Sequence, residues 1–549
     1  MTAISNRQDP IEAPLSQSGA TDSEALKQLI DLGLALSAEH DHARLLERIL
    51  LGAKHLTKAD GGTLYLLSDN HLQFRLIYND SLKIALNGDD QCTASFPPLP
   101  LHLDDGGANH NNLATYVALT GKSVTIADAY GDISFDFSGI RAFDARTGYR
   151  SKSLLAVPLK NNKHEVLGVL QLINARPART SPETTDCIAF NDEILPLINA
   201  LASQAAIALD NQRLLQEQRE LFDAFITMMA QAIDAKSPYT GGHCERVPVL
   251  TEMLAQAACY ESEGPLADFS LTAEQWYELR VAGGLHDVGK VTTPVHILDK
   301  ATKLEKIHDR IHEVKTRLEL LRRDAEIACL KAQLAGTSRE LAEAECDARL
   351  TELDSMSAFL AKANIGGEFM ADADIERLRQ IANESWSLQA APQPLLEEEE
   401  LENLSIRRGT LNAADRKIVN DHIVHTIRML ETLPFPKHLR NVAEIAGGHH
   451  EKMDGTGYPK GLKRHEMSWL ARMMGIADIF EALTACDRPY KAPKTLSESI
   501  GIMAEMKRTG HIDPDLFDLF LRSGIYRRYA ERFLEPCQID AVDIAACLA

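Results

Sequence analysis

The sequence predicts a multidomain protein. An α+β domain, with a central antiparallel sheet and flanking helices, is followed by a long linker helix and an all-α domain that carries an inserted helical hairpin. Three observations predict this order. The 549 residues exceed what one hydrophobic core usually holds. Short β-rich segments are concentrated before residue 193, and helical periodicity dominates after it.

Composition limits the classes of function. A formal net charge of -21 and a pI of about 5.4 argue against nucleic-acid and anionic-membrane binding, although a small anionic ligand stays compatible. The nine cysteines form no CxxC pair, which is typical of a reducing compartment. No apolar stretch of about 20 residues occurs, and residues 1–23 read as a disordered tail. These features predict a cytoplasmic protein.

The first domain is expected at 24–212. The segments GGTLYLLS, LQFRLIY, SLLAVPLK and VLGVLQLIN are short, rich in β-formers and separated by turn residues, so we expect strands. Helical patterns flank them on both sides. Such an arrangement is typical of an α+β sensor domain rather than of a parallel α/β fold.

The linker helix is expected at 193–235. Apart from Pro196 near its start, this stretch contains neither Gly nor Pro, and its apolar positions recur every three to four residues. One rod between two domains is typical of a dimerising helix that carries a signal. The alternative is a helix that only packs on its own domain.

An insertion is expected at about 303–408 within the last domain, 236–549. Apolar residues repeat there with alternating spacings of four and three, first at Ile307, Ile311, Val314, Leu318 and Leu321, then at Leu350, Leu353 and Leu360. The two runs predict an antiparallel helical hairpin around Ala335–Ser338. The acidic stretch 395–403 that follows reads as a flexible segment with a solvated face.

Histidines and aspartates in otherwise apolar helical segments form a candidate metal centre. The set is His243, His286, Asp287, His422, His449, His450 and Asp478. Imidazole and carboxylate ligands suit iron, manganese or zinc, and a carboxylate can bridge two ions. A pair of ions can act on a phosphodiester as a clamp. The alternative is a collection of separate buried histidines, each satisfied by hydrogen bonds.

One motif resembles a known family. HDVGK (286–290), followed by HHEKMDGTGYP (449–459), resembles the HD-GYP phosphodiesterases, a branch of the helical, metal-dependent HD superfamily. The resemblance covers about 236–300 and 411–525. It implies an all-α HD-type metallohydrolase domain that hydrolyses cyclic di-GMP with two or three metal ions, often iron.

The same resemblance implies roles for individual residues. The seven residues above would be the metal ligands, with Asp287 bridging two ions and also catalytic. Lys290 would be catalytic and bind the phosphate, and Arg488 and Lys491 in DRPYK (487–491) would bind substrate. Residues 236–242 contain no acid, so we expect two divalent ions, iron first and manganese or another metal next. Glu481 stands where relatives often have Asp.

The first domain resembles the GAF domains of cyclic-nucleotide phosphodiesterases and cyclases. IADAY (126–130), VLGVLQLINA (166–175) and FNDE (190–193) carry the resemblance. Asn174, Phe190, Asp192 and Glu193 match the family motif, whereas Ala175 replaces its lysine. The GAF ligand stays unknown, with a cyclic nucleotide as one hypothesis and a ligand-free dimerisation domain as the other.

Together these readings predict a homodimeric signalling enzyme that converts cyclic di-GMP to linear pGpG and possibly on to GMP, regulated by its GAF domain. A GGDEF-type cyclase is a candidate partner through the GYP loop (457–459). Two alternatives stay open. The domain could bind a cyclic dinucleotide without hydrolysing it, or it could hydrolyse another signalling nucleotide, such as a hybrid cyclic dinucleotide or a guanosine polyphosphate.

Overall fold

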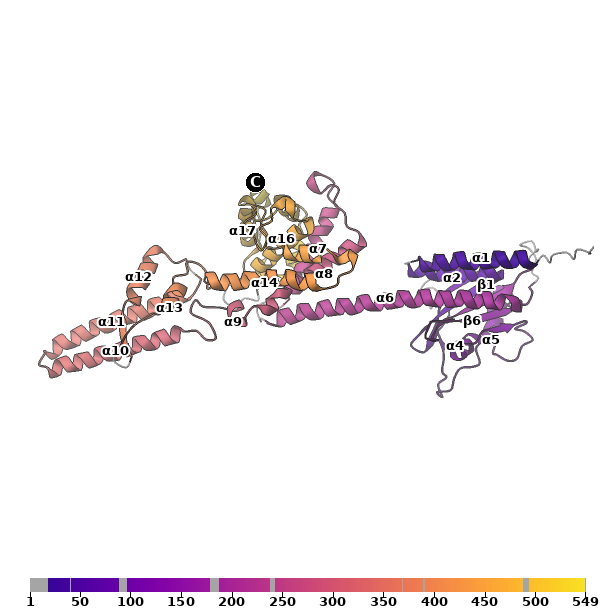
Figure 1. Cartoon of the computed structure of the whole chain (residues 1–549), viewed down its shortest axis with the longest axis horizontal. Coiled ribbons are helices and arrows are strands. Elements are labelled where there is room, and N and C mark those ends of the chain that lie inside the picture. Colours follow the sequence, from indigo (N-terminus) through magenta and orange to yellow (C-terminus); the bar gives the residue numbers. More distant parts are fainter. Residues whose placement is uncertain are drawn as a thin grey trace, which may run out of the picture. The chain divides into compact units, whose positions relative to one another are not determined.

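The computed structural model describes residues 18–39, 41–87, 96–177, 187–236, 242–367, 369–388, 391–486 and 493–548. The chain divides into two compact units, 1–221 and 222–549, which are described separately below (Figure 1). Helix α6, Leu195–Lys236, contributes residues to both units. None of the described helices combines the length and the apolar character needed to cross a lipid bilayer.

The first unit is built on an antiparallel sheet. Its strands are β1 (Ala59–Ser68), β2 (His71–Asn79), β3 (Ile84–Asn87), β4 (Leu99–Pro100), β5 (Val124–Ile126), β6 (Leu154–Lys160) and β7 (Val166–Ala175). The order is β3-β2-β1-β7-β6-β5, with β4 also paired to β2. The four segments expected as strands correspond to β1, β2, β6 and β7. This confirms the α+β class.

Helices cover both faces of this sheet. Helices α1 (Ser18–Ser37), α2 (His42–Thr57) and α6 pack on one face, and α4 (Leu113–Thr120) packs on the other with α5 (Ser138–Thr147) nearby. Successive β1 residues Leu64 and Tyr65 belong to opposite cores, as the two-residue period of a strand requires. Helix α1 begins inside the segment expected as a disordered tail, of which residues 1–17 lie outside the described part.

The second unit is helical around one main core. Its helices are the end of α6, α7 (His243–Cys259), α8 (Ala273–Leu285), α9 (Val295–Leu298), α14 (Ala413–Thr432), α15 (Val442–Gly447), α16 (Trp469–Thr484), α17 (Leu496–Arg508), α18 (Pro514–Arg522), α19 (Ile525–Phe533) and α20 (Ile544–Leu548). Buried Ile226, Ala230 and Ile233 of α6 join this core with α7, α8 and α16. The all-α class is thereby confirmed, and α6 is part of the domain that it enters.

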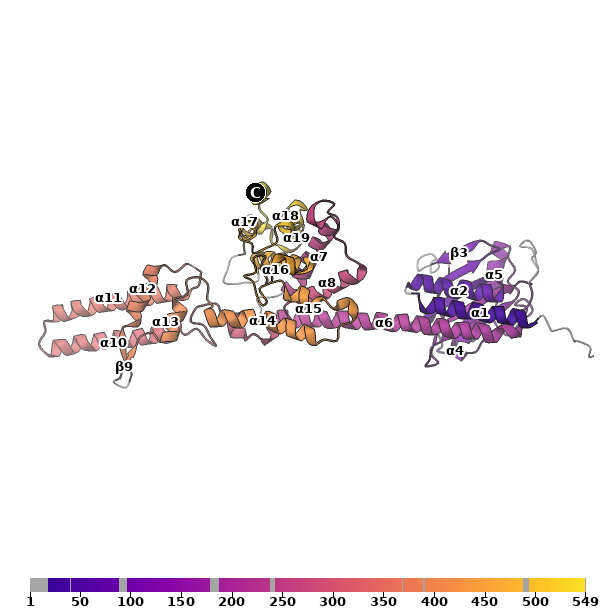
Figure 2. The same cartoon turned by 45° about the horizontal axis from the view of Figure 1, so that its top comes forward.

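The insertion is a small subdomain with a core of its own. Helices α10 (Ile311–Leu334) and α11 (Arg339–Asn364) pair as the expected hairpin, and α12 (Asp372–Ala382), a β8–β9 ribbon (Ser385–Leu388, Ala391–Pro394) and α13 (Glu398–Leu404) complete it (Figure 2). The predicted seam is confirmed at Ile311, Val314, Leu318, Leu321, Leu353 and Leu360, which are all buried in one cluster. Leu350 is half-buried.

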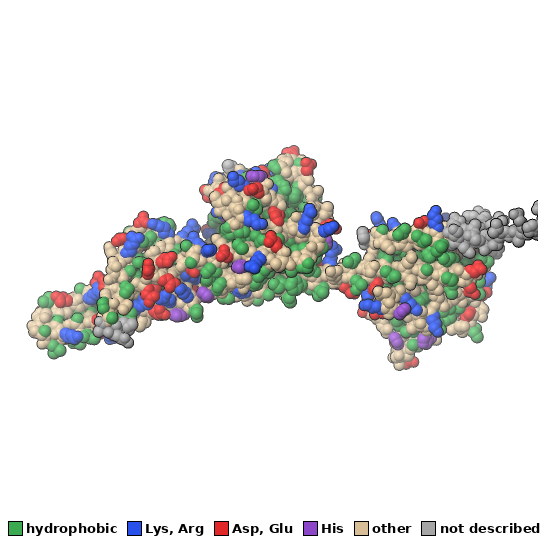
Figure 3. All heavy atoms as spheres, in the orientation of Figure 1, with side chains coloured by type: hydrophobic (Ala, Val, Ile, Leu, Met, Phe, Trp, Pro, Cys, Tyr) green, Lys and Arg blue, Asp and Glu red, His purple; other side chains and the backbone are tan. Residues whose placement is uncertain are grey.

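Two expectations for the insertion are wrong. Ile307 is 92% exposed and precedes α10, so it takes no part in the seam. The acidic stretch is not a flexible segment, because Leu395 and Leu396 are buried and α13 follows them, whereas the expected solvated face is confirmed by the exposed Glu397, Glu398, Glu399 and Glu402. Glu400 of α13 is fully buried and accepts two hydrogen bonds from Arg317, at 2.6 and 3.1 Å. Acidic and basic side chains lie interleaved over the rest of this surface (Figure 3).

Candidate metal centre

The seven predicted ligands come together in the second unit. His243 opens α7, His286 and Asp287 follow α8, His422 lies in α14, His449 and His450 follow α15, and Asp478 lies in α16. Three overlapping groups bring possible ligand atoms within 4.8 Å of one another: His243–His286–Asp478, His286–Asp287–His449 and His422–His449–His450. Most of these side chains are buried, and His450 and Asp478 are half-buried.

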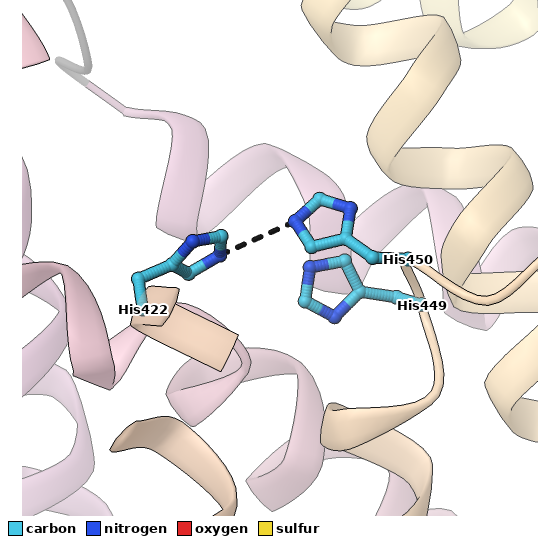
Figure 4. Close-up of side chains that lie close together, drawn as sticks. All are labelled: His422, His449 and His450. Carbon is cyan, nitrogen blue, oxygen red and sulfur yellow. Dashed lines mark hydrogen bonds between the residues drawn. The ribbon is translucent and has the colours of Figure 1, made fainter. Parts of the chain in front are cut away.

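The first group surrounds His243. Its Nε2 lies 3.3 Å from His286 Nε2, 3.3 Å from Asp478 Oδ1 and 3.1 Å from Asp287 Oδ2. The third group surrounds His422, whose Nε2 lies 3.2 Å from His450 Nε2, with the His449 ring tilted against that of His450 (Figure 4). Each group presents imidazole nitrogens to a common centre.

Asp287 connects the two groups. Its Oδ2 lies 3.1 Å from His243 and 3.3 Å from His286, whereas its Oδ1 lies 3.3 Å from Nε2 of His422. Among the described residues, Oδ1 is buried without a hydrogen bond of acceptable geometry, and so is Nε2 of His449. A carboxylate with one oxygen toward each group is suited to bridge two cations.

Backbone carbonyls fix the tautomer of three histidine rings. Nδ1 of His286 lies 2.7 Å from the Gly283 oxygen, Nδ1 of His422 lies 2.5 Å from the Val419 oxygen, and Nδ1 of His449 lies 2.6 Å from the Ala446 oxygen. A carbonyl oxygen can only accept, so each Nδ1 carries the proton. Each Nε2 therefore offers its lone pair to the centre, which is the tautomer that a metal ligand needs.

The donor set fits metal ions. With metal–nitrogen bonds of about 2.1 Å, two adjacent ligands of one ion lie about 3.0–3.4 Å apart, for bond angles between octahedral and tetrahedral. The 3.3 Å between His243 and His286 and the 3.2 Å between His422 and His450 fall in this range. The residues therefore fit two divalent ions with nitrogen and oxygen ligands.

Electrostatics supports cation binding. Burial and the neighbouring histidines lower the pKa of His450, and burial lowers the pKa of His449 to about 4, so both rings are neutral at pH 7. Although burial opposes it, Lys290 and His286 hold the pKa of Asp287 well below its ordinary value. The aspartate is thus charged, and the neutral rings of His449 and His450 have free lone pairs.

Glu481 is a residue of the site that sequence reasoning did not assign. Its Oε2 lies 2.5 Å from Nδ1 of His243, and its Oε1 accepts 2.8 and 2.6 Å bonds from Arg246. Although burial opposes it, contacts with Asp287, Asp478 and Glu481 hold the pKa of His243 well above its ordinary value. The signal was present in the sequence, because Glu481 lies three residues after Asp478 on the same face of α16.

Of the three predicted substrate contacts, Lys290 lies beside the candidate centre, and the other two fall outside the described residues. The ammonium of Lys290 is 2.5 Å from Oδ2 of Asp287 and is 19% exposed, so it reaches the rim of the centre. Contacts with Asp287 and Asp478 raise its pKa against the effect of burial. Arg488 and Lys491 fall in 487–492, outside the described residues.

The GYP motif builds a loop against the ligands. Buried Glu451 accepts hydrogen bonds from the amides of Lys460, at 2.7 Å, and Leu462, at 2.9 Å. Gly457 has no room for a side chain, because a Cβ there would lie 2.3 Å from the Lys452 nitrogen. The Tyr458 ring stacks on His450, with centroids 5.0 Å apart. The motif therefore does more than make a tight turn, since it supports a predicted ligand.

The GAF motif residues have structural roles. Asn174 at the end of β7 accepts hydrogen bonds from the Lys152 and Ser153 amides, at 2.7 and 3.2 Å, and so fixes the start of β6. Phe190 is buried in the core under the helical face. Asp192 and Glu193 are exposed in a short 3-10 turn.

Comparisons with known proteins agree with both domains. The GAF domain profile matches residues 41–209, and the HD domain profile matches residues 395–516. The chain therefore carries a GAF domain and an HD domain. His243, His286 and Asp287 precede the HD match because the insertion separates them from it in sequence, and the fold returns them to the site.

Curated relatives of this GAF–HD chain are cyclic-dinucleotide phosphodiesterases. The 3'3'-cGAMP-specific phosphodiesterase 3 of Vibrio cholerae is 25% identical over 322 residues, covering 58% of this chain and 41% of the relative. Cyclic di-GMP phosphodiesterase PA4108 of Pseudomonas aeruginosa is 37% identical over 138 residues, covering 25% of this chain and 30% of the relative. A probable cyclic di-GMP phosphodiesterase of V. cholerae is 49% identical over 84 residues, covering 15% and 19%. The chain thus spans less than half the length of each.

Proposed function

We propose that this protein is a metal-dependent phosphodiesterase that opens cyclic di-GMP to linear pGpG, and then yields GMP, under the control of its GAF domain. The observation that carries this proposal is the pair of histidine groups joined by the two oxygens of Asp287. The names of the relatives support the substrate class, because they describe cyclic di-GMP and cGAMP phosphodiesterases.

The chain's own residues bind the ions and orient the phosphate. His243, His286 and Asp478 would hold one ion, His422, His449 and His450 would hold the other, and Asp287 would offer one oxygen to each. When bound, two divalent ions neutralise phosphate charge and lower the pKa of water. Lys290 keeps its proton at pH 7 and donates hydrogen bonds to a phosphate oxygen at the rim of the site. Arg488 and Lys491 grip the remaining phosphate oxygens; arginine is suited to do so with two hydrogen bonds.

The test is turnover with matched substrates. Protein purified without oxygen is analysed for iron and manganese, then incubated with cyclic di-GMP and separately with 3'3'-cGAMP, and the products are separated by chromatography. We expect two ions per chain, with iron preferred, and conversion of cyclic di-GMP to pGpG and GMP. Lys290→Ala should reduce turnover while metal content stays constant, at about 1.5–3 kcal/mol for a lost charge-assisted bond.

The outcomes separate the alternatives. Tight binding of cyclic di-GMP without product, in protein loaded with two ions, would identify a receptor and reject the enzyme. Faster conversion of 3'3'-cGAMP would identify the hybrid dinucleotide as the substrate. That second candidate is favoured by one observation, the match that covers 58% of this chain and belongs to a cGAMP-specific enzyme.

Self-association through α6 is part of the proposal. Ile207, Leu214, Leu221 and Met228 follow one another at intervals of seven residues and are between 47% and 73% exposed. Hydrophobic side chains also gather along the edge of the second unit where α6 runs (Figure 3). An exposed heptad seam is typical of a parallel coiled coil between two copies. Leu214→Glu should convert a dimer to a monomer in sedimentation velocity, and a monomeric wild type would reject the dimer.

Three further parts of the proposal concern its setting. The protein works in the cytoplasm, in keeping with its nine scattered cysteines, which form no CxxC pair. A small molecule, with a cyclic nucleotide as the first candidate, binds the GAF domain. A GGDEF-type cyclase docks on the GYP loop. Thermal-shift screening with cyclic nucleotides and pull-down with a Tyr458→Ala control test the last two parts.

A further inference from the structure

The last turn of α6 holds the segments that carry His243 and Lys290. We propose that Asp234 and Lys236 are positioning residues, which set the places of the metal ligand His243 and the phosphate contact Lys290 according to the position of α6. The inference rests on the proposed function for its chemical meaning. Its contacts lie entirely within the second unit.

Asp234 supplies the missing cap of α7. This helix begins at His243, and its N-cap residue, Gly242, has no side chain to accept from the first amides. Asp234 of α6 takes that role: its Oδ2 accepts from the Gly242 amide at 3.0 Å and its Oδ1 accepts from the Cys244 amide at 3.4 Å. A carboxylate at a helix N-terminus is also favoured by the helix dipole. The two bonded amides flank His243, so the carboxylate fixes the backbone of a metal ligand.

Lys236 makes the second connection. Its ammonium donates to the carbonyl oxygens of Lys290, at 2.8 Å, and Val291, at 2.5 Å. These carbonyls belong to the 3-10 turn Val288–Thr292, which directly follows the bridging Asp287. Lys236 therefore holds the backbone of Lys290, and the side chain of Lys290 reaches Asp287 and the rim of the centre. A displacement of Lys236 would move that turn.

Close packing ties the end of α6 to helix α8, which His286 and Asp287 directly follow. A Cβ on Gly284 would lie 2.6 Å from Cγ2 of Ile226, so nothing larger than glycine fits there, two residues before His286. Tyr277 of α8 also donates a 2.9 Å hydrogen bond to Asp223 of α6. Because these contacts leave no spare room, a rotation of α6 about its axis would disturb them.

Helix α17 has an ordinary cap, with which Asp234 can be compared. Thr495 caps α17 from its own N-cap position, accepting from the Glu498 amide at 3.4 Å. Losing either cap should lower stability. Only the loss of Asp234 should also change a metal site, because α7 begins with a ligand and α17 does not. Thr495→Ala is therefore the matched control for Asp234→Ala.

The experiment measures Mn²⁺ affinity of the full-length protein by competition with a fluorescent chelator, together with thermal unfolding. Asp234→Ala should weaken Mn²⁺ binding about tenfold or more, within the range seen when a residue that orients a metal ligand is lost. Thr495→Ala should lower the melting temperature with unchanged affinity. Asp234→Asn, which keeps the shape and one acceptor, should lie between Asp234→Ala and the wild type and provides a folded variant if the alanine variant is unstable.

Amide hydrogen exchange in the metal-free protein is the second readout. Asp234→Ala should speed exchange at residues 242–247, and Thr495→Ala should not. For Lys236, kcat should fall about tenfold in Lys236→Met at unchanged metal content and should recover in Lys236→Arg, with Gln231→Ala as a control on the exposed side of the same helix.

The role of Asp234 would be overturned if both Asp234 variants had the same Mn²⁺ affinity and the same amide exchange as Thr495→Ala. Unchanged kcat in Lys236→Met would overturn the role of Lys236. Failure of the proposed function would look different, because wild-type protein loaded with two ions would then leave cyclic di-GMP intact. The affinity and exchange comparisons would still decide the role of Asp234.

Discussion

Removal of the Glu481 carboxylate should weaken metal binding without unfolding the domain. Glu481 lies 2.5 Å from Nδ1 of His243 and accepts hydrogen bonds from Arg246, which is 20% exposed and can turn to water when its partner is lost. Partners that orient a metal-bound histidine typically contribute about 10–100-fold to metal affinity. This corresponds to about 1.4–2.7 kcal/mol, and Glu481→Gln should fall at the lower end because its amide oxygen still accepts a hydrogen bond.

The assay compares Glu481→Ala and Glu481→Gln with a buried carboxylate that serves only the fold. Glu278 of α8 is 2% exposed and accepts from the backbone amide and side chain of Asn441, at 2.7 and 3.1 Å. Glu278→Gln should lower the melting temperature and keep Mn²⁺ affinity, whereas both Glu481 variants should lose affinity. Wild-type affinity in Glu481→Ala, measured on protein that still unfolds cooperatively, would refute the argument that this carboxylate orients His243.

Four further predictions follow from the second unit and α6. Asp287→Asn, which keeps the shape and loses the charge, should abolish hydrolysis and reduce bound metal; normal metal content and turnover would exclude a bridging carboxylate. Replacing 303–408 with a short Gly/Ser link should leave a folded, metal-loaded domain with an altered KM, because the insertion has its own core; precipitation or metal loss would place the insertion in the main core. Burial lowers the pKa of Lys303 to about 8, below the value of about 10.4 for an unfolded chain, so between these pH values the unfolded state binds more protons. The stability of the wild type relative to Lys303→Met, from urea titrations, should therefore rise with pH across this window, and a flat difference would argue against the shift. Inserting one to four residues near Gln216 should change activity with a period of about 3.6 residues, and a dimer with a flat profile would make α6 a passive tether.

The sequence alone determined the classes of both domains and named the ligand candidates that the fold brings together. Strand-like alternation in the first domain and helical periodicity in the second are local signals, set by which face of an element is buried, so β1, β2, β6 and β7 could be expected from the sequence. HDVGK and HHEKMDGTGYP contain four of the seven metal-ligand candidates, and histidines or an aspartate in neighbouring apolar helical segments supplied His243, His422 and Asp478, because metal chemistry demands particular residue types. The hairpin seam from Ile311 to Leu321 was visible because the spacing of apolar residues along a helix is also a local signal.

Tertiary structure decided which neighbours complete each local pattern. The charges of 395–403 suggest a solvated segment, yet Glu400 is buried because Arg317 of α10 reaches it from 83 residues away. Asp234 looks like an ordinary surface acid in sequence, and Glu481 stands out there only by its spacing from Asp478. The packing of α16 and α6 around α7 brings these carboxylates to His243 and to its helix N-terminus. Hydrogen-bond partners distant in sequence leave no periodic trace, since a carboxylate has the same local preferences whether it meets water, an arginine or a ligand's imidazole.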